Sequence, residues 1–212
     1  SGQEYFYGKD GIDTIDASEY GSAVYIGIGS NVQTAFQTDL SGSLTMVARL
    51  YTFENAIGSE YGDQIVGNNA ANEIYGGAGN DILDGGGGDD LLIGGDGDDV
   101  FDGGSGRDLM YGEAGDDLFR LFDGWNGSYG EIIVGGAGSD TFDISGTNVA
   151  TSTIDLADGT FNYTPGGAGA ISLSSIENVI GNTGSDAISG SGEVNSLWGR
   201  SGNDTLLGQG GN

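Results

Sequence analysis

The sequence predicts an all-β protein: a right-handed parallel β-roll with antiparallel, β-sandwich-like spacers beside it, in two module copies of which the second is truncated. Three observations predict this fold. A glycine recurs at every ninth position between residues 58 and 120, the sixth position of each nonapeptide is Asp or Asn, and the eighth is a large apolar residue. The nonapeptides follow one another without a gap and begin at Gly58, Gly67, Gly76, Gly85, Gly94, Gly103 and Gly112.

Each nonapeptide divides into a loop and a short strand. Glycine at the first, second and fourth positions lets the loop adopt positive φ values and keeps side chains out of the way, so that loop carbonyls can converge on a cation. Positions seven to nine are long enough only for a minimal strand, whose middle side chain points inward. Two nonapeptides therefore form one flattened coil, and successive coils stack at the ordinary strand spacing of about 4.8 Å.

Stacking places residues eighteen positions apart over one another, so that each gap between loops is a candidate site for a hard cation. Oxygen ligands in flexible geometry suit Ca²⁺ better than Mg²⁺ or Zn²⁺. The aligned carboxylates are Asp63, Asp81, Asp99 and Asp117 on one edge and Asp90 and Asp108 on the other. The spacing leaves open which carbonyls bind; the candidate glycines are Gly77, Gly79, Gly86, Gly88, Gly95, Gly97, Gly104 and Gly106.

Some units depart from this pattern. Tyr61 and Ala70 replace the fourth-position glycine and Asn72 replaces Asp, so the site between Asn72 and Asp90 is expected to be weak or empty. Glu113, at a second position, is expected to face solvent. The same orientation is expected of the fifth-position side chains Asn80, Asp89, Asp98 and Asp116.

The composition excludes several classes of function. The net charge is -27 with only 5 Lys plus Arg, which argues against a nucleic-acid partner. The chain has no Cys and no His, which removes disulfides, thiolate metal sites and histidine-based catalysis. No apolar run approaches the ~20 residues needed to span a bilayer, and no signal peptide opens the sequence. Because so acidic and glycine-rich a chain repels itself, we expect folding to wait for a cation.

The chain follows one plan twice. Residues 1–134 form a first module, with an isolated nonapeptide at 8–16, a β spacer at 17–57, the array at 58–120 and an aromatic insertion at 121–134. Residues 135–212 form a second, with a nonapeptide at 135–143, a β spacer at 144–180 and a truncated array at 181–212. In that second array Asp186 over Asp204 is the one full carboxylate pair.

The best units, GGAGNDILD from Gly76 and GGDGDDVFD from Gly94, fit the pattern G-G-x-G-x-D-x-U-x, in which U is a large apolar residue. The chain thereby resembles the RTX, or hemolysin-type, calcium-binding β-roll modules. The stretches 53–58 and 176–181, which match each other, extend the resemblance to the C-terminal domain of serralysin-type secreted metalloproteases. The resemblance implies several Ca²⁺ ions and type I secretion from a Gram-negative bacterium.

The same resemblance implies one further Ca²⁺ site in each module, shared between the isolated nonapeptide and the stretch before the array. In the first module the implied ligands are Asp13, the Thr52 carbonyl and Glu54. In the second module they are Asp140, Ser175 and Glu177.

The predicted function is that of a non-catalytic, secreted calcium-binding domain that folds on binding Ca²⁺ outside the cell and stabilises, or supports secretion of, a larger parent protein. Its partners would be attached domains of that parent. One alternative is a calcium-dependent polysaccharide-binding module resembling the R modules of mannuronan epimerases, with a cell-surface glycan as partner. Another is an adhesin or S-layer fragment that associates through its β-roll ends. Trp125, Asn126, Tyr129 and Glu131 are the stretch most like a binding surface, with capping of a β-edge as the other interpretation.

Overall fold

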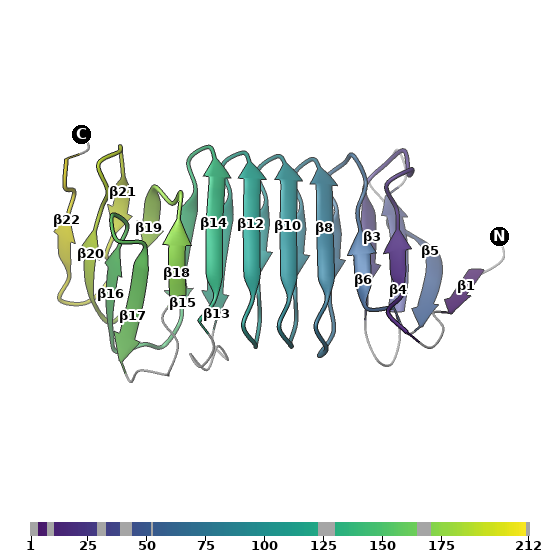
Figure 1. Ribbon diagram of the computed structural model, residues 1–212, viewed down its shortest axis with the longest axis horizontal. Helices are drawn as coiled ribbons and strands as arrows, with labels where there is room; N and C mark the ends of the chain where they lie inside the picture. Colours follow the sequence, from purple (N-terminus) through teal and green to yellow (C-terminus); the bar gives the residue numbers. More distant parts are fainter. Residues whose placement is uncertain are drawn as a thin grey trace.

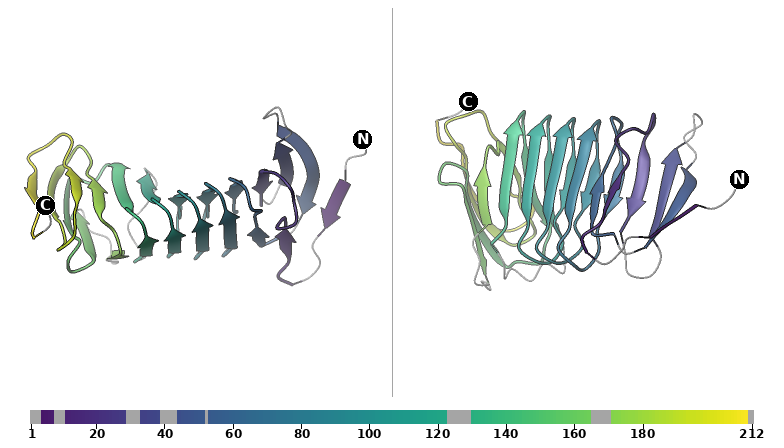
Figure 2. Two further views of the ribbon diagram at one scale, coloured as in Figure 1. Left: turned by 90° about the horizontal axis from the view of Figure 1, so that it is seen from above. Right: turned by 45° about the vertical axis from the view of Figure 1, so that its right-hand side comes forward.

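The computed structural model describes the backbone of residues 4–7, 11–28, 33–38, 44–51, 53–122, 130–164 and 171–210, and the side chains of 11–28, 53–122, 130–164 and 171–210. These residues form strands joined by loops and turns, and two long sheets lie face to face (Figures 1 and 2). None of the described segments is a helix that could cross a membrane.

Within the described residues each sheet has eleven strands. The first sheet runs in the order β1 (Glu4–Tyr7), β5 (Leu44–Tyr51), β4 (Gln33–Thr38), β3 (Val24–Gly27), β7 (Gln64–Val66), β9 (Ile82–Asp84), β11 (Val100–Asp102), β13 (Leu118–Phe122), β15 (Thr141–Gly146), β19 (Asn178–Ile180) and β21 (Ser196–Trp198). The second runs in the order β2 (Thr14–Asp16), β6 (Asn55–Ile57), β8 (Glu73–Ala78), β10 (Leu91–Asp96), β12 (Leu109–Ala114), β14 (Ile132–Ala137), β18 (Ile171–Ser174), β17 (Thr160–Thr164), β16 (Thr151–Asp155), β20 (Ser185–Ser189) and β22 (Thr205–Leu207).

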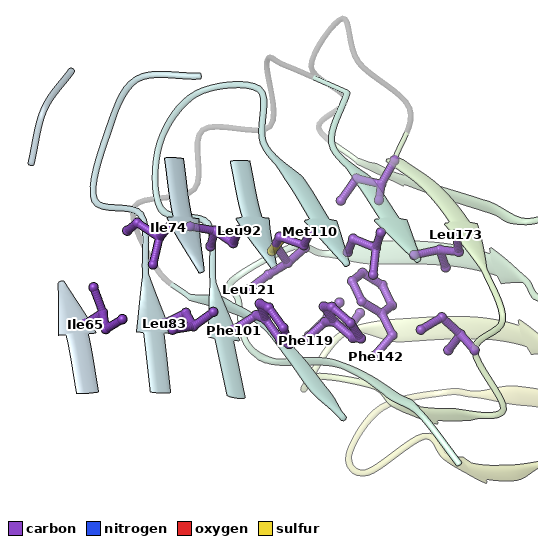
Figure 3. Packing of buried hydrophobic residues seen from close by; sticks show 14 of the residues in the cluster. Ile65, Ile74, Leu83, Leu92, Phe101, Met110, Phe119, Leu121, Phe142 and Leu173 are labelled. Atoms are coloured by element: carbon purple, nitrogen blue, oxygen red, sulfur yellow. The ribbon is translucent and has the colours of Figure 1, made fainter. Parts of the chain in front are cut away.

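The central strands pair in parallel with the predicted offset of eighteen residues. Leu91 pairs with Leu109 in the second sheet and Val100 with Leu118 in the first, so each coil contributes one strand to each sheet. The eighth-position side chains fill the space between the sheets, as predicted, and are at most 1 % exposed (Figure 3). They are Ile65, Ile74, Leu83, Leu92, Phe101, Met110 and Phe119. The structure is therefore a parallel β-roll whose core is formed by one row of apolar side chains from each sheet (Figure 3).

The offset grows to twenty-three residues after β12. Leu109 pairs with Ile132 and Leu118 with Thr141, so one coil holds five extra residues without breaking the stack. The predicted insertion at 121–134 is consequently too wide, because β13 continues to Phe122 and β14 begins at Ile132. Trp125, Asn126 and Tyr129 lie outside the described residues. Of the two interpretations of this stretch, a binding surface or a cap on a β-edge, the first is wrong for Glu131, which is buried at 1 % exposed.

The two spacers contain antiparallel strands, as predicted, but they join different sheets. In the first module β3, β4 and β5 pair antiparallel, and β3 then pairs in parallel with β7 of the first sheet. In the second module β16, β17 and β18 pair antiparallel, and β16 pairs in parallel with β20 of the second sheet. The two module copies are thus half a coil out of phase. Residue 134 lies within β14, and both sheets contain strands from before and after it, so the module boundary there stays a prediction from the sequence.

Glu113 is exposed, as predicted, but its φ of 75° lies in the left-handed region that favours glycine. We expect Glu113→Gly to stabilise the Ca²⁺-loaded protein by roughly 0.5 to 1 kcal/mol, because relief of backbone strain outweighs the added entropy of the unfolded chain. Urea unfolding at saturating Ca²⁺ measures this. Glu193→Gly is the matched control, because Glu193 is also exposed but lacks a positive φ, and it should lower stability. If the two substitutions change the free energy of unfolding equally, the backbone at Glu113 is not strained.

Candidate metal centre

The sixth-position side chains form two rows that run along the edges of the roll. Each row lies just before the strands of one sheet, so the strand register fixes the spacing of its members. The first row, before strands of the first sheet, consists of Asp63, Asp81, Asp99, Asp117, Asp140 and Glu177. The second row, before strands of the second sheet, consists of Asp13, Glu54, Asn72, Asp90, Asp108 and Glu131.

Backbone amides hold the carboxylates in these rows. The amide of Asp81 donates to Oδ1 of Asp99 at 2.8 Å, and the amide of Asp99 donates to Oδ1 of Asp117 at 2.8 Å. The contact continues across the longer coil, where the amide of Asp117 donates to Oδ1 of Asp140 at 2.9 Å. Each coil therefore orients the carboxylate of the next one, and the predicted stacking of residues eighteen apart is confirmed.

The second carboxylate oxygen has a different environment. In five aspartates the Oδ2 atom has no hydrogen-bond partner among the described residues. Water cannot replace the missing partner freely, because each of these residues is at most 1 % exposed. A buried oxygen of this kind costs free energy unless a proton or a cation pairs with it. These aspartates are Asp81, Asp90, Asp99, Asp117 and Asp140.

Burial also changes the acidity of the rows. Loss of solvent raises the pKa of Asp81 and Asp90 to about 8, with smaller contributions from neighbouring carboxylates. For the same main reason the pKa of Asp99 and Asp108 rises to about 7 and that of Asp117 to about 6. Without a counter-charge the four groups with a pKa of about 7 or 8 would hold protons for a large part of the time at neutral pH, which is the behaviour of a site that lacks its cation.

Glycine is required where adjacent loops touch. A Cβ on Gly95 would overlap the carbonyl oxygen of Gly77, and one on Gly106 would overlap that of Gly88; both glycines have positive φ. The carbonyls of Gly79 and Gly86 likewise abut the loop one coil further on, at Gly97 and Gly104 respectively. These carbonyls lie between coils, where the sequence placed candidate ligands, and their role as ligands stays a prediction.

Two predicted ligands have both carboxylate oxygens occupied by the protein itself. Oδ1 of Asp63 accepts a hydrogen bond from the amide of Val24 at 2.6 Å and Oδ2 accepts one from the amide of Ser59 at 2.5 Å. Each oxygen of Asp186 is occupied in the same way: Oδ1 by the Ser152 hydroxyl at 2.7 Å and Oδ2 by the Asn182 amide at 2.9 Å. Both residues stand in the first nonapeptide of an array and contact the preceding spacer.

Asparagine occupies the next loop of each array. Oδ1 of Asn72 accepts from the Asn68 amide at 2.8 Å while its Nδ2 donates to the Glu54 carbonyl at 2.5 Å. Asn195 makes the same two contacts, with the amide of Ser191 at 2.6 Å and the carbonyl of Glu177 at 2.9 Å. The oxygen and the nitrogen of each side-chain amide are therefore both hydrogen-bonded to the protein, at a position where an Asp would carry a charge. The prediction of a weak site next to Asn72 has this contact as its physical basis.

The structure brings together the pairs that the resemblance implied. The amide of Asp13 donates to Oε2 of Glu54, and the amide of Asp140 to Oε2 of Glu177, both at 2.9 Å. The Ser175 carbonyl and Oδ2 of Asp140 both lie against the Cα of Gly135, while Thr52 lies outside the described residues. The last predicted pair is also stacked, because the amide of Asp186 donates to Oδ1 of Asp204 at 3.0 Å.

The fifth-position side chains form a second, exposed ladder, which confirms their outward orientation. The amide of Asp98 donates to Oδ1 of Asn80, and the amide of Asp116 to Oδ1 of Asp98. Asp89 accepts from the Arg107 amide and lies 4.0 Å from its guanidinium, an exposed pair of small energetic value.

Glu131 is the row member that the sequence analysis missed. It precedes Ile132 just as Asp108 precedes Leu109, and its charge raises the pKa of Asp108. An acidic residue directly before three apolar ones was the available signal. No group of three or more acidic side chains converges on one point in the described parts of the chain. The carboxylates meet in succession along each row, so a cation between coils would need carbonyl oxygens as well.

Comparison with known families gives one match. The model of the RTX calcium-binding nonapeptide repeat fits the sequence in four copies, at residues 57–92, 84–119, 125–143 and 180–212, which together span more than half of the chain. The matches include every member of the two rows except Asp13, Glu54 and Glu177 and leave out residues 1–56, 120–124 and 144–179, so the resemblance of the spacers to serralysin-type proteins stays a prediction. No curated protein matches the chain.

Proposed function

The chain belongs to the family of RTX calcium-binding nonapeptide-repeat proteins, and we propose that it is a non-catalytic module that folds on binding Ca²⁺ outside the cell and stabilises a larger secreted protein. RTX repeats bind Ca²⁺, and several copies of the repeat mean several ions. Such repeats are typical of secreted extracellular proteins. We further propose that the chain folds outside the cell, is exported by type I secretion and stabilises a larger parent protein.

The unpartnered carboxylate oxygens carry this proposal. Five aspartates place a buried Oδ2 atom beside the first glycine of their own loop, without a hydrogen-bond donor among the described residues, so each of these oxygens needs a proton or a cation. When bound, Ca²⁺ supplies positive charge and accepts six to eight oxygen ligands in flexible geometry. Asp81, Asp99, Asp117 and Asp140 in the first row and Asp90 in the second would hold it, together with loop carbonyls.

The compartment follows from affinity. Extracellular calcium modules bind with Kd of about 10⁻⁴ to 10⁻³ M, well above the free Ca²⁺ of a cytoplasm. A chain with net charge -27 would then stay unfolded during export and fold in a medium rich in Ca²⁺. Coils would add one after another along the stack, since each contacts only its neighbours. A polysaccharide or a second copy as partner remains a prediction from the sequence.

A Ca²⁺ titration monitored by far-UV circular dichroism tests this proposal. We expect a cooperative gain of β signal at sub-millimolar to millimolar Ca²⁺, about 10⁻⁴ to 10⁻³ M. Mg²⁺ should fail to replace Ca²⁺ because it demands a rigid octahedral site and loses its water reluctantly. A chain that is fully folded in excess chelator, or that responds equally to Mg²⁺, would refute calcium-driven folding.

A further inference from the structure

The backbone at the second position separates two groups of loops among the described residues. In open loops, defined here as 76–81, 85–90, 94–99, 112–117 and 135–140, the second residue has a positive φ and the sixth-position Asp has an unpartnered Oδ2. In closed loops, defined as 58–63, 67–72, 181–186 and 190–195, the second residue lacks a positive φ and its amide donates to the sixth-position side chain. The second residues of the closed loops are Ser59, Asn68, Asn182 and Ser191. Loops 103–108 and 199–204 belong to neither group: their second residues, Gly104 and Arg200, have a positive φ, but Oδ2 of Asp108 and of Asp204 is not among the buried unpartnered atoms.

The direction of one N–H group accounts for the difference. At positive φ the amide of the second residue no longer points at its own loop's sixth residue. In loops that lead to the first sheet, the second residue is instead part of a strand ladder, where Gly95 pairs with both Gly77 and Glu113. In loop 85–90, which leads to the second sheet, the amide of Gly86 donates instead to the carboxylate of Asp84. The Oδ2 atom of an open loop thus loses its protein donor.

We propose that the second residue decides whether a loop binds a cation. Open loops bind Ca²⁺ through the unpartnered Oδ2 atom of the sixth residue. Closed loops bind none, because the amide of the second residue already donates a hydrogen bond to the sixth-position side chain. The inference rests on the proposed function and adds which loops are used. It reassigns Asp63 and Asp186, which the sequence pattern marks as ligands, to a purely structural role. The side chain at position six is therefore insufficient to define a site.

The closed loops stand where each array meets its spacer. In both modules the first two loops of the array are closed, and their side chains bind spacer atoms of Val24 or Ser152, or the carbonyl of Glu54 or Glu177. Both partners in each of these contacts are protein atoms, so the contacts require no cation. Each array therefore begins on a surface that is satisfied in the absence of Ca²⁺, on which the calcium-dependent coils can stack.

Ion counting separates the two kinds of loop. Equilibrium dialysis with radioactive calcium at saturating concentration should give the same number of bound ions for the unmodified chain, Asp63→Asn and Asp186→Asn. Asp81→Asn, at the same loop position one coil after Asp63, should lose at least one ion. Asp98→Asn, an exposed fifth-position control, should lose none. If Asp63→Asn loses as many ions as Asp81→Asn, the inference is overturned; if the unmodified chain binds no Ca²⁺, the proposed function fails instead.

A gain of binding provides a second, independent test. Asn72→Asp alone restores the carboxylate but leaves the Asn68 amide in place, so we expect no additional ion. Asn68→Gly combined with Asn72→Asp should open the loop, add one ion and lower stability in chelator. An additional ion in the single variant, or none in the double variant, would show that the second residue does not control the site.

Discussion

Replacing Asp99 by Asn should weaken Ca²⁺-dependent stability severely while making the calcium-free fold more stable. Asp99 lies in the middle of the first row, between Asp81 and Asp117, so its carboxylate borders two gaps between coils. At a Ca²⁺ concentration a hundredfold above Kd, each site stabilises the fold by about 2.7 kcal/mol, and loss of both would remove about 5 kcal/mol. That is comparable to the whole stability of a small domain.

The calcium-free effect has the opposite sign. In the absence of a cation, Asp99 is a buried carboxylate whose pKa is raised to about 7 by desolvation and then by the charges of Asp117 and Asp98. An amide of the same shape can keep the hydrogen bond from the Asp81 amide and removes that charge. Asn72 shows that an asparagine fits the sixth position of a loop in this chain. We expect a gain of about 1 kcal/mol, of the order of one hydrogen-bonded polar group.

Urea unfolding with Ca²⁺ and with chelator measures both effects. Asp98→Asn is the matched control, because Asp98 is the preceding residue, is exposed, and also accepts a hydrogen bond from an amide one coil away. Asp98→Asn should change the free energy of unfolding by no more than a few tenths of a kcal/mol, both with Ca²⁺ and with chelator. If Asp99→Asn behaves like Asp98→Asn in the presence of Ca²⁺, the rows are not the calcium sites.

The repeat made most of the fold predictable. A period of nine with an apolar eighth residue implies a strand on each side and an offset of eighteen between stacked residues, and the pairing of Leu91 with Leu109 follows it. The same arithmetic places Asp81 next to Asp99. Each of these contacts depends only on the position within the repeat, so one unit determines the others.

The arithmetic failed where the period changed. After β12 the offset is twenty-three, and a residue from outside the nonapeptides, Glu131, takes the place of a repeat Asp in the second row. Nothing in the periodicity indicates where a longer coil rejoins the stack. The strand register shows where the longer coil rejoins the stack. Ile132 pairs with Leu109, so Glu131, which precedes Ile132, takes the position next to Asp108 in the second row.

The closed loops were unpredictable for another reason. Asp63 and Asp81 occupy the same position of the repeat, yet the Asp63 carboxylate is filled by the amides of Ser59 and Val24. The contact from Val24 comes from a spacer strand that has no nine-residue period. Sequence periodicity identifies which residues can lie in a row, whereas the hydrogen bonds of each oxygen depend on backbone direction and on neighbours distant in the chain.

The calcium-free protein should be more folded in mild acid than in mild alkali. The folded-state pKa values of Asp81 and Asp90 are about 8 and that of Asp99 about 7, all raised above the ordinary value of 3.8. The folded chain therefore binds these protons more tightly than the unfolded chain. The stabilisation is complete below the ordinary pKa and is lost as pH rises through the folded values, by about 1.4 kcal/mol per pH unit for each proton taken up on folding.

Saturating Ca²⁺ should reverse this dependence, because protons and cations compete for the same oxygens. Lowering the pH from about 8 to about 5 should then raise the Ca²⁺ concentration at the folding midpoint while increasing β signal in chelator. Circular dichroism at the two pH values, with and without Ca²⁺, measures both trends. Asp99→Asn lacks one of the titrating groups, so its calcium-free profile should be flatter near pH 7, where Asp99 titrates. A calcium-free chain equally structured at both pH values would mean that protonation cannot replace the cation in the rows.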